Sequence, residues 1–219
     1  MATNNPNTPN TKAKTKAIIL DFGGVIGTEV PRAFIQEVAV KEDLNVEELV
    51  AVWRDHFGPL LLGTISEEEF WLRFIDRLGV EKPIEEVMPE YKKLIRTLMI
   101  WDRQLLAYIK ELKADHPQVT IAIASNNVRE WMVDFVKRHD LSKYVDKQYW
   151  SYDLALRKPD QLFFDKVCQD LALKPQECIF IDNNEGNIES ASRLGFVTHR
   201  YTELAALKKF MDSAIMEKG

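Results

Sequence analysis

Residues 17–26 constrain the fold of this chain more than any other part of the sequence. Four apolar residues, Ala17–Leu20, run directly into Asp21, and Gly23 and Gly24 follow at once. An uninterrupted apolar run of this length is typical of a strand that is covered on both faces, as in a parallel sheet. An acid at the end of such a strand, before a glycine turn, lies where open α/β sheets bind their ligands. Taken alone, the stretch is equally consistent with an ordinary turn and a solvated acid.

The composition narrows the class of protein. Of the 219 residues, 46% are hydrophobic, and the formal net charge is -5, which argues against nucleic acid or an anionic membrane as the main partner. No apolar run approaches the roughly 20 residues that cross a bilayer, and Met1–Lys16 lacks the apolar segment of a signal peptide. The two cysteines, Cys168 and Cys178, do not have the spacing of a metal site. We therefore expect a cytoplasmic protein with a disordered polar tail over residues 1–16.

A helical segment interrupts the strand pattern after residue 27. Apolar residues recur at helical spacing over residues 31–43, 46–57, 67–78 and 84–100. Gly58-Pro59 predicts a break that ends the second of these helices. Ser66 predicts the start of the third helix, with Ser66 to Glu69 as a capping box, and Gly79 predicts its end. The segment from residue 28 to 100 is thus expected to contain helices alone.

From Trp101 onward, helices and strands alternate. Apolar runs predict strands over residues 119–124, 147–151, 178–181 and 196–199, each separated from the next by a helical pattern. Alternating units of this kind form a parallel sheet with helices on both faces. The sequence therefore predicts an α/β protein with a Rossmann-like core, made of residues 17–27 and 101–219, and an all-helical insertion over residues 28–100.

Polar side chains stand where three of these strands end. They are Asp21, Ser125 and Asp182, and a fourth polar group, Lys158, lies in the loop over residues 156–160. The ends of parallel strands meet at one edge of a sheet, so these groups can converge although they are far apart in sequence. A carboxylate can attack phosphorus or carbon, while a hydroxyl and an ammonium can hold the oxygens of a phosphate. Two neighbouring acids also favour a hard cation such as Mg²⁺.

With these motifs on one chain, the sequence resembles the haloacid dehalogenase (HAD) superfamily. Asp21–Val25 resembles the first family motif, and Ser125-Asn126, Lys158-Pro159 and Asp182–Asn187 resemble the second, third and fourth. The helical insertion is similar to the C1 cap of this superfamily. Within it, Gly63–Ser66 with Phe70-Trp71 is like the branch of sugar phosphatases and epoxide-hydrolase N-terminal domains.

The resemblance implies a role for each motif residue. Asp21 is implied as the nucleophile, Ser125 and Asn126 as ligands of the transferred group, and Lys158 as a catalytic and substrate-binding residue that steadies the charge. The implied metal site comprises the Asp21 carboxylate, the Gly23 carbonyl, Asp182 and Asn183, and its ion is Mg²⁺. A cap that closes over a small phosphorylated metabolite and excludes water is implied as well.

Two positions depart from the family pattern. Gly23 stands where family phosphatases usually carry a second aspartate, whose side chain serves as general acid and base. Asn183 stands where a metal-binding aspartate is usual, and an uncharged amide oxygen is expected to hold Mg²⁺ more weakly. We therefore expect weakened acid–base chemistry, with a preference for leaving groups of low pKa. Two residues of the insertion, Glu29 and His56, are candidates to replace the missing acid.

Three functions follow from this pattern. The first is a Mg²⁺-dependent phosphatase that forms an aspartyl-phosphate on Asp21. The second is a metal-independent 2-haloacid dehalogenase, whose branch also lacks the second aspartate, although it usually has a bulky aromatic residue where this chain has Gly23. The third is a catalytically weak relative that binds a metabolite or a protein partner.

Overall fold

The computed structural model describes residues 14–79 and 82–215, and its centre is a five-stranded sheet of order β3-β2-β1-β4-β5 with every pair parallel. The strands are β1 (Ala17–Leu20), β2 (Thr120–Ser125), β3 (Lys147–Trp150), β4 (Cys178–Asp182) and β5 (Val197–Arg200). The apolar run of β1 has a structural reason, because β1 is the central strand and all four of its residues are buried. The predicted α/β fold class is confirmed.

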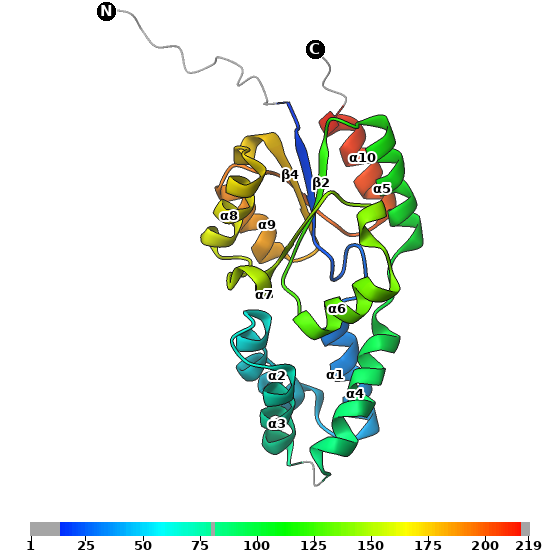
Figure 1. The fold of residues 1–219 in the computed structure, drawn as a ribbon, viewed down its shortest axis with the longest axis vertical. Helices are drawn as coiled ribbons and strands as arrows, with labels where there is room; N and C mark the ends of the chain where they lie inside the picture. The colour runs from blue at the N-terminus through cyan, green and yellow to red at the C-terminus, as the bar shows by residue number, and fades with distance from the viewer. Residues whose placement is uncertain (1–13, 80–81, 216–219) are drawn as a thin grey trace, which may run out of the picture.

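Helices cover both faces of the sheet. They are α5 (Arg103–Asp115), α6 (Arg129–Arg138), α7 (Ser151–Leu154), α8 (Gln161–Leu171), α9 (Glu185–Arg193) and α10 (Leu204–Ile215). In Figure 1, α5 and α10 lie on one side of the strands, and α8 and α9 lie on the other. The alternation of side chains along β1 matches this arrangement. Ile18 and Leu20 pack with the cluster that includes α5 and α10, while Ala17 and Ile19 pack with the cluster of α8 and α9.

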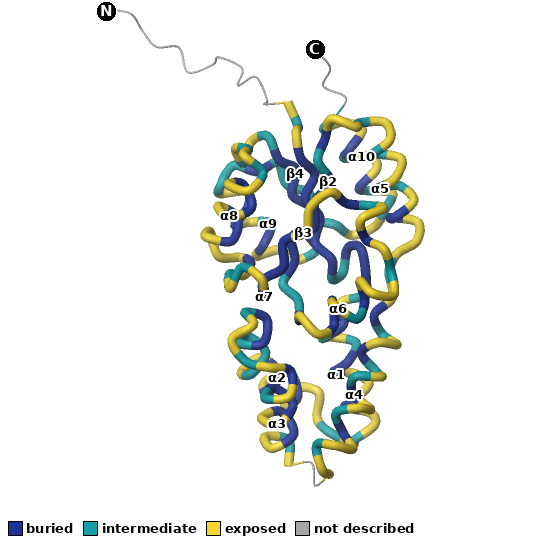
Figure 2. The backbone as a smooth tube through the Cα atoms, viewed as in Figure 1, coloured by how far each residue is buried: buried dark blue, intermediate teal, exposed yellow. Residues whose placement is uncertain are grey.

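Four further helices, which we call the inserted helices, follow the first strand and its turn. They are α1 (Val30–Lys41), α2 (Val46–Leu61), α3 (Glu67–Leu78) and α4 (Ile84–Leu98). They lie beyond the carboxyl ends of the strands (Figure 1), and their inward faces are buried (Figure 2). Aromatic rings fill their centre: Phe34, Trp53 and Trp71 lie within 5.3–6.2 Å of one another between ring centroids. The aromatic residues of the insertion therefore form a packed core.

The predicted break at Gly58-Pro59 is wrong. Helix α2 continues through both residues to Leu61. Proline in a helix interior removes one backbone hydrogen bond and crowds the preceding turn. Here Leu60 and Leu61 are buried at the end of the same helix, so their apolar contacts favour its continuation over the local preference of Pro59. Gly79, in contrast, ends α3 in the left-handed conformation, as predicted.

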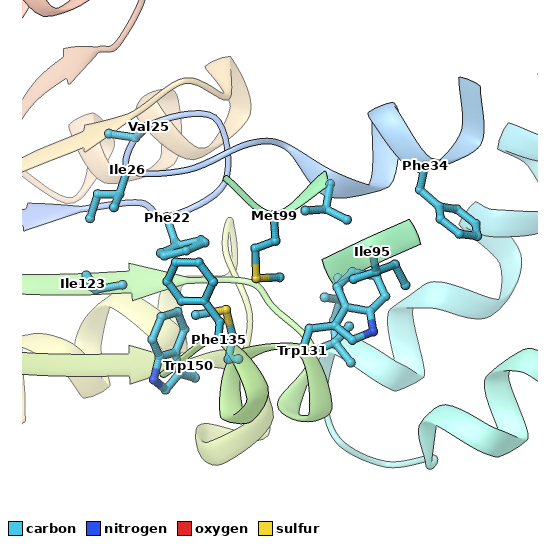
Figure 3. Packing of buried hydrophobic residues seen from close by; sticks show 14 of the residues in the cluster. Phe22, Val25, Ile26, Phe34, Ile95, Met99, Ile123, Trp131, Phe135 and Trp150 are labelled. Carbon is cyan, nitrogen blue, oxygen red and sulfur yellow. The ribbon is translucent and has the colours of Figure 1, made fainter. Parts of the chain in front are cut away.

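The inserted helices and the sheet share one apolar cluster. Phe22 contacts Phe135 edge-on, with ring centroids 5.2 Å apart, and Met99 lies between this pair and Trp131 in Figure 3. Met99 belongs to the connection from α4 to α5, and Trp131 belongs to α6. The division of the chain into a core and a cap at residues 27–28 and 100–101 remains a prediction.

The polar tail lies largely outside the described residues, since the structure describes the chain from residue 14. Lys16 already joins the sheet: its N–H donates to the Glu177 carbonyl at 2.8 Å, and its carbonyl accepts from Thr120 N–H at 2.9 Å. Within the described ranges, none of the helices is both long enough and apolar enough to span a bilayer.

Candidate active site

Three neighbouring strands deliver polar groups to the same edge of the sheet. Leu20, the last residue of β1, lies opposite Ile123 of β2 and Ile181 of β4. Because all three strands run in the same direction, the residues that follow this register emerge together. Those residues include Asp21 and Asp182, as the sequence predicts, and Ser125 ends β2 beside them.

Lys158 completes the group and lies between the two acids. Its Nζ is 2.9 Å from Asp21 Oδ1 and 2.6 Å from Asp182 Oδ2, and the residue is only 2% exposed. The side-chain amide of Asn126 fixes the Lys158 backbone, because its Oδ1 accepts from Lys158 N–H at 2.9 Å and its Nδ2 donates to the Lys158 carbonyl at 2.8 Å. A buried ammonium with two carboxylate partners is a charge fixed in place.

Asp182 is fully buried, and both of its oxygens accept hydrogen bonds from the protein. Oδ1 accepts from Asn184 N–H at 2.8 Å, and Oδ2 accepts from Lys158 and from Asn187 Nδ2, the latter at 3.0 Å. Asn184 also caps α9 through its own side chain, which accepts from Asn187 N–H. In this arrangement Asp182 orients Lys158.

Asp21 is the acid that reaches the open side of the site. Its Oδ1 accepts from Phe22 N–H at 2.7 Å and from Lys158. The pKa of Asp21 is raised to about 6, mainly because the side chain is buried. The positive charge of Lys158 lowers this pKa, and the negative charge of Asp182 raises it. Hydrogen bonds from Lys158 and Ser125 lower it as well.

A cavity of about 150 Å³ opens over Asp21, at the junction of the sheet edge and the inserted helices. Its polar lining comes largely from amides, and Val30, Phe57, Met99 and Trp131 supply an apolar wall. The lining residues are Asp21, Phe22, Gly23, Thr28, Glu29, Val30, Pro31, Phe57, Met99, Asn126, Asn127, Trp131, Asn183, Asn184 and Asn187.

Three of the four predicted metal ligands face this cavity: Asp21, Gly23 and Asn183. They offer carboxylate, carbonyl and amide oxygens, which Mg²⁺ accepts, and Mg²⁺ commonly binds through one or two carboxylates together with waters and substrate phosphate. The donor set therefore fits a magnesium ion, with Asp21 as the one carboxylate among these three cavity-facing ligands. Asp182 is not among the lining residues, and the described part of the chain has no cluster of three or more acidic, histidine or cysteine side chains arranged for a metal.

Gly24 explains the second glycine of the first motif. Its φ of +81° lies in the left-handed region, and a Cβ at this position would lie 2.2 Å from Asn183 Nδ2. The absence of a side chain at residue 24 thus lets the loop after β1 approach the loop after β4. Gly23, in contrast, has open space, since a Cβ there would meet the Thr28 carbonyl at 4.0 Å.

The structure brings the predicted residues together, but they do not all reach the surface of the cavity. Asn126 lines the cavity, while Ser125 and Lys158 lie just behind it, nearly fully buried. Of the two candidate replacements for the missing acid, Glu29 lines the cavity and His56 does not. The sequence gives no signal for Trp131, which reaches the site from α6 through tertiary packing alone.

Comparisons with known proteins bear on the family of this chain. Residues 15–195 match the haloacid dehalogenase-like hydrolase family. A D-ribitol-5-phosphate phosphatase of Bacteroides thetaiotaomicron is 28% identical over 190 residues, which are 84% of this chain and 90% of the relative. An (S)-2-haloacid dehalogenase of Burkholderia cepacia is 30% identical over 80 residues, 36% of this chain and 35% of that enzyme.

Solved structures show the same fold. A HAD family enzyme of Bacteroides thetaiotaomicron, in complex with magnesium and inorganic phosphate, aligns with a TM-score of 0.69 at 20% identity, covering 88% of this chain and 98% of the other. The L-2-haloacid dehalogenase of Xanthobacter autotrophicus aligns with a TM-score of 0.61 at 17% identity, covering 93% and 85%. Since the family match extends over most of the chain and includes all four motif regions, this protein is a member of the haloacid dehalogenase-like hydrolases.

Proposed function

We propose that this hydrolase is a Mg²⁺-dependent phosphatase that removes phosphate from a small metabolite through an aspartyl-phosphate on Asp21. The observation that carries the proposal is the placement of Asp21 at the floor of a small cavity, with Lys158 fixed beside it. The similarity to a ribitol-phosphate phosphatase and to an enzyme crystallised with magnesium and phosphate supports it.

The proposed reaction has two steps. In the first, an oxygen of Asp21 attacks phosphorus, the bond between phosphorus and the leaving oxygen breaks, and the phosphoryl group is transferred to the carboxylate. As charge moves onto the phosphoryl oxygens, Asn126 stabilises them from the cavity wall, and Ser125 and the positive charge of Lys158 stabilise them from directly behind it. In the second step, water attacks phosphorus, and the bond to Asp21 breaks to release inorganic phosphate.

When bound at Asp21, Gly23 and Asn183, Mg²⁺ would offset the negative charge of the phosphoryl group. Asp21 is the one carboxylate in this ligand set, which makes the site weaker than one with two carboxylate ligands. Gly23 supplies no acid to protonate the leaving group, and loss of a general acid typically costs about 10²–10⁴ in rate. The proposed phosphatase is therefore weakened in its acid–base step and is expected to prefer leaving groups of low pKa.

A panel of phosphorylated metabolites, assayed for phosphate release with Mg²⁺ and with a chelator, tests the function. We expect Mg²⁺-dependent release for at least one small substrate. Asp21→Asn is expected to abolish it, because an amide cannot act as the nucleophile. Asp55→Asn, an exposed aspartate on α2, is the matched control and is expected to keep full activity. Release that persists undiminished in Asp21→Asn contradicts the mechanism.

A 2-haloacid dehalogenase is the second candidate. The absence of an aspartate at position 23 and the small number of metal ligands favour it, and solved dehalogenases share the fold. The glycine itself counts against it, because that branch usually has a bulky aromatic residue at this position. In that reaction Asp21 displaces halide from carbon, and the resulting ester is hydrolysed. Halide release from a 2-haloacid, undiminished by a chelator and without phosphatase activity, would favour this candidate. The absence of both activities would favour a metabolite- or protein-binding role.

A further inference from the structure

The cavity contains one ionisable side chain that the proposed reaction does not yet use. Among the lining residues in the described part of the chain, only Asp21 and Glu29 carry side chains that can exchange a proton. Asp21 is committed to nucleophilic attack. Lys158 lies behind the cavity wall, held by two carboxylates, so it is poorly placed to give up a proton. Glu29 is therefore the remaining candidate for proton transfer.

The loop after β1 places Glu29 near the position of the missing acid. Gly24 N–H donates to the Gly27 carbonyl at 2.6 Å, and Gly23 pairs with Gly27 in an isolated bridge. This tight turn brings Thr28 against Gly23, so that a Cβ built on Gly23 points toward the Thr28 carbonyl 4.0 Å away. A side chain on residue 23 would thus extend toward the segment that carries Glu29.

Within residues 14–79 and 82–215, the Glu29 carboxyl has no structural partner. Glu29 occupies the N-cap position of α1, but its side chain accepts no capping hydrogen bond. It forms no ion pair with another described residue, and the residue is exposed. Its side chain is one methylene longer than that of aspartate, and Glu29 lines the same cavity as Gly23.

We propose that Glu29 is the general acid and base of this site and replaces the aspartate that Gly23 lacks. In the first step the protonated Glu29 carboxyl gives its proton to the leaving oxygen as the phosphorus–oxygen bond breaks. In the second step the Glu29 carboxylate takes a proton from the water that attacks the aspartyl-phosphate, and the acid is restored. The inference rests on the proposed phosphatase function and deepens it. Glu29 is exposed and is therefore held less firmly than an aspartate in the first motif would be. This agrees with the weakened acid–base chemistry that the sequence predicts.

Two aryl phosphates of similar shape test this role. Phenyl phosphate has a poor leaving group that needs a proton, whereas p-nitrophenyl phosphate has a good one that does not. Glu29→Gln is expected to lower kcat/KM for phenyl phosphate by about 10²-fold, the low end of general-acid effects, and for p-nitrophenyl phosphate by less than about threefold. Glu37→Gln, an exposed residue on the same helix, is the matched control and is expected to change neither value.

A second experiment tests whether an aspartate at position 23 restores the activity that Glu29→Gln loses. Gly23→Asp fits the open space at residue 23, so the double variant Gly23→Asp, Glu29→Gln is expected to recover activity on phenyl phosphate. Equal losses on both substrates, or no loss beyond that of Glu37→Gln, would overturn the role of Glu29 while leaving the phosphatase function intact. Failure of the function itself gives a different result, because the wild-type protein would then release no phosphate from either compound.

Discussion

Asp21 carries its charge where water reaches it poorly, and its pKa of about 6 in the folded chain lies above its ordinary value of 3.8. The folded chain therefore binds this proton more tightly than the unfolded chain does. The resulting contribution to stability is complete below about pH 4 and is lost as the pH rises through about 6. Burial is the main cause of the raised pKa. At neutral pH, the charged Asp21 side chain therefore lowers the stability of the fold, because it is held at a buried position beside the cavity.

Asp21→Asn removes this titration. Without metal, we expect the free energy of unfolding of the variant to exceed that of wild type at neutral pH by at most about 3 kcal/mol. The decrease in wild-type stability between about pH 4 and 6 should be absent from the variant. Urea unfolding in the presence of a chelator, repeated across this pH range, measures both effects. The exposed Asp55→Asn is expected to follow the wild-type curve. Parallel curves for Asp21→Asn and wild type would show that Asp21 titrates normally.

Several site residues could be predicted from the sequence because strand ends place them. Asp21, Ser125 and Asp182 each end or follow an apolar run, and parallel strands bring such ends together. The role of Asn184 as the cap of α9 and the bond from Asn187 to Asp182 could not be predicted in detail. An asparagine near a helix start fits either role, and only the three-dimensional contacts distinguish them.

At the scale of elements, one contact between α3 and α6 joins the inserted helices to the sheet half of the molecule. Trp131 Nε1 donates to Glu67 Oε1 at 2.9 Å, and Lys92 Nζ lies 2.9 Å from Glu67 Oε2. Glu67 is 3% exposed although it stands in the acidic first turn of α3. The sequence predicts a capping box from Ser66 and Glu69. Ser66 does cap the helix, and the neighbouring Glu67 makes the long-range contact that periodicity could not reveal.

Removing this contact leaves the indole N–H of Trp131 buried without its acceptor. Glu67→Ala is therefore expected to lower the free energy of unfolding by about 1–3 kcal/mol, since an unsatisfied buried donor costs that much. Glu68→Ala, the exposed next residue of the same turn, is expected to change stability by less than about 0.5 kcal/mol. Chemical denaturation of both variants compares them. Equal effects would mean that the bond to Trp131 contributes nothing beyond an ordinary surface residue.

At the scale of the whole molecule, the central strand and the remaining strands are separated in sequence by the inserted helices. The sheet could still be predicted, because each strand carries its own apolar run and β1 is buried on both sides. The continuation of α2 through Pro59 and the cavity wall could not, because both depend on packing between distant segments. Phe57 from α2 and Trp131 from α6 meet at the same cavity, with ring centroids 5.8 Å apart.

The proposed mechanism depends on phosphorylation of Asp21 during turnover. Wild-type protein with Mg²⁺ and p-nitrophenyl phosphate, quenched with acid during turnover and digested, can be analysed by peptide mass spectrometry. We expect the peptide that contains Asp21 to gain the mass of one phosphoryl group and fragmentation to place that group on Asp21, whereas Asp21→Asn shows no such gain. Phosphate release without any phosphorylated Asp21, or a phosphoryl group on another residue, would show that the mechanism is wrong.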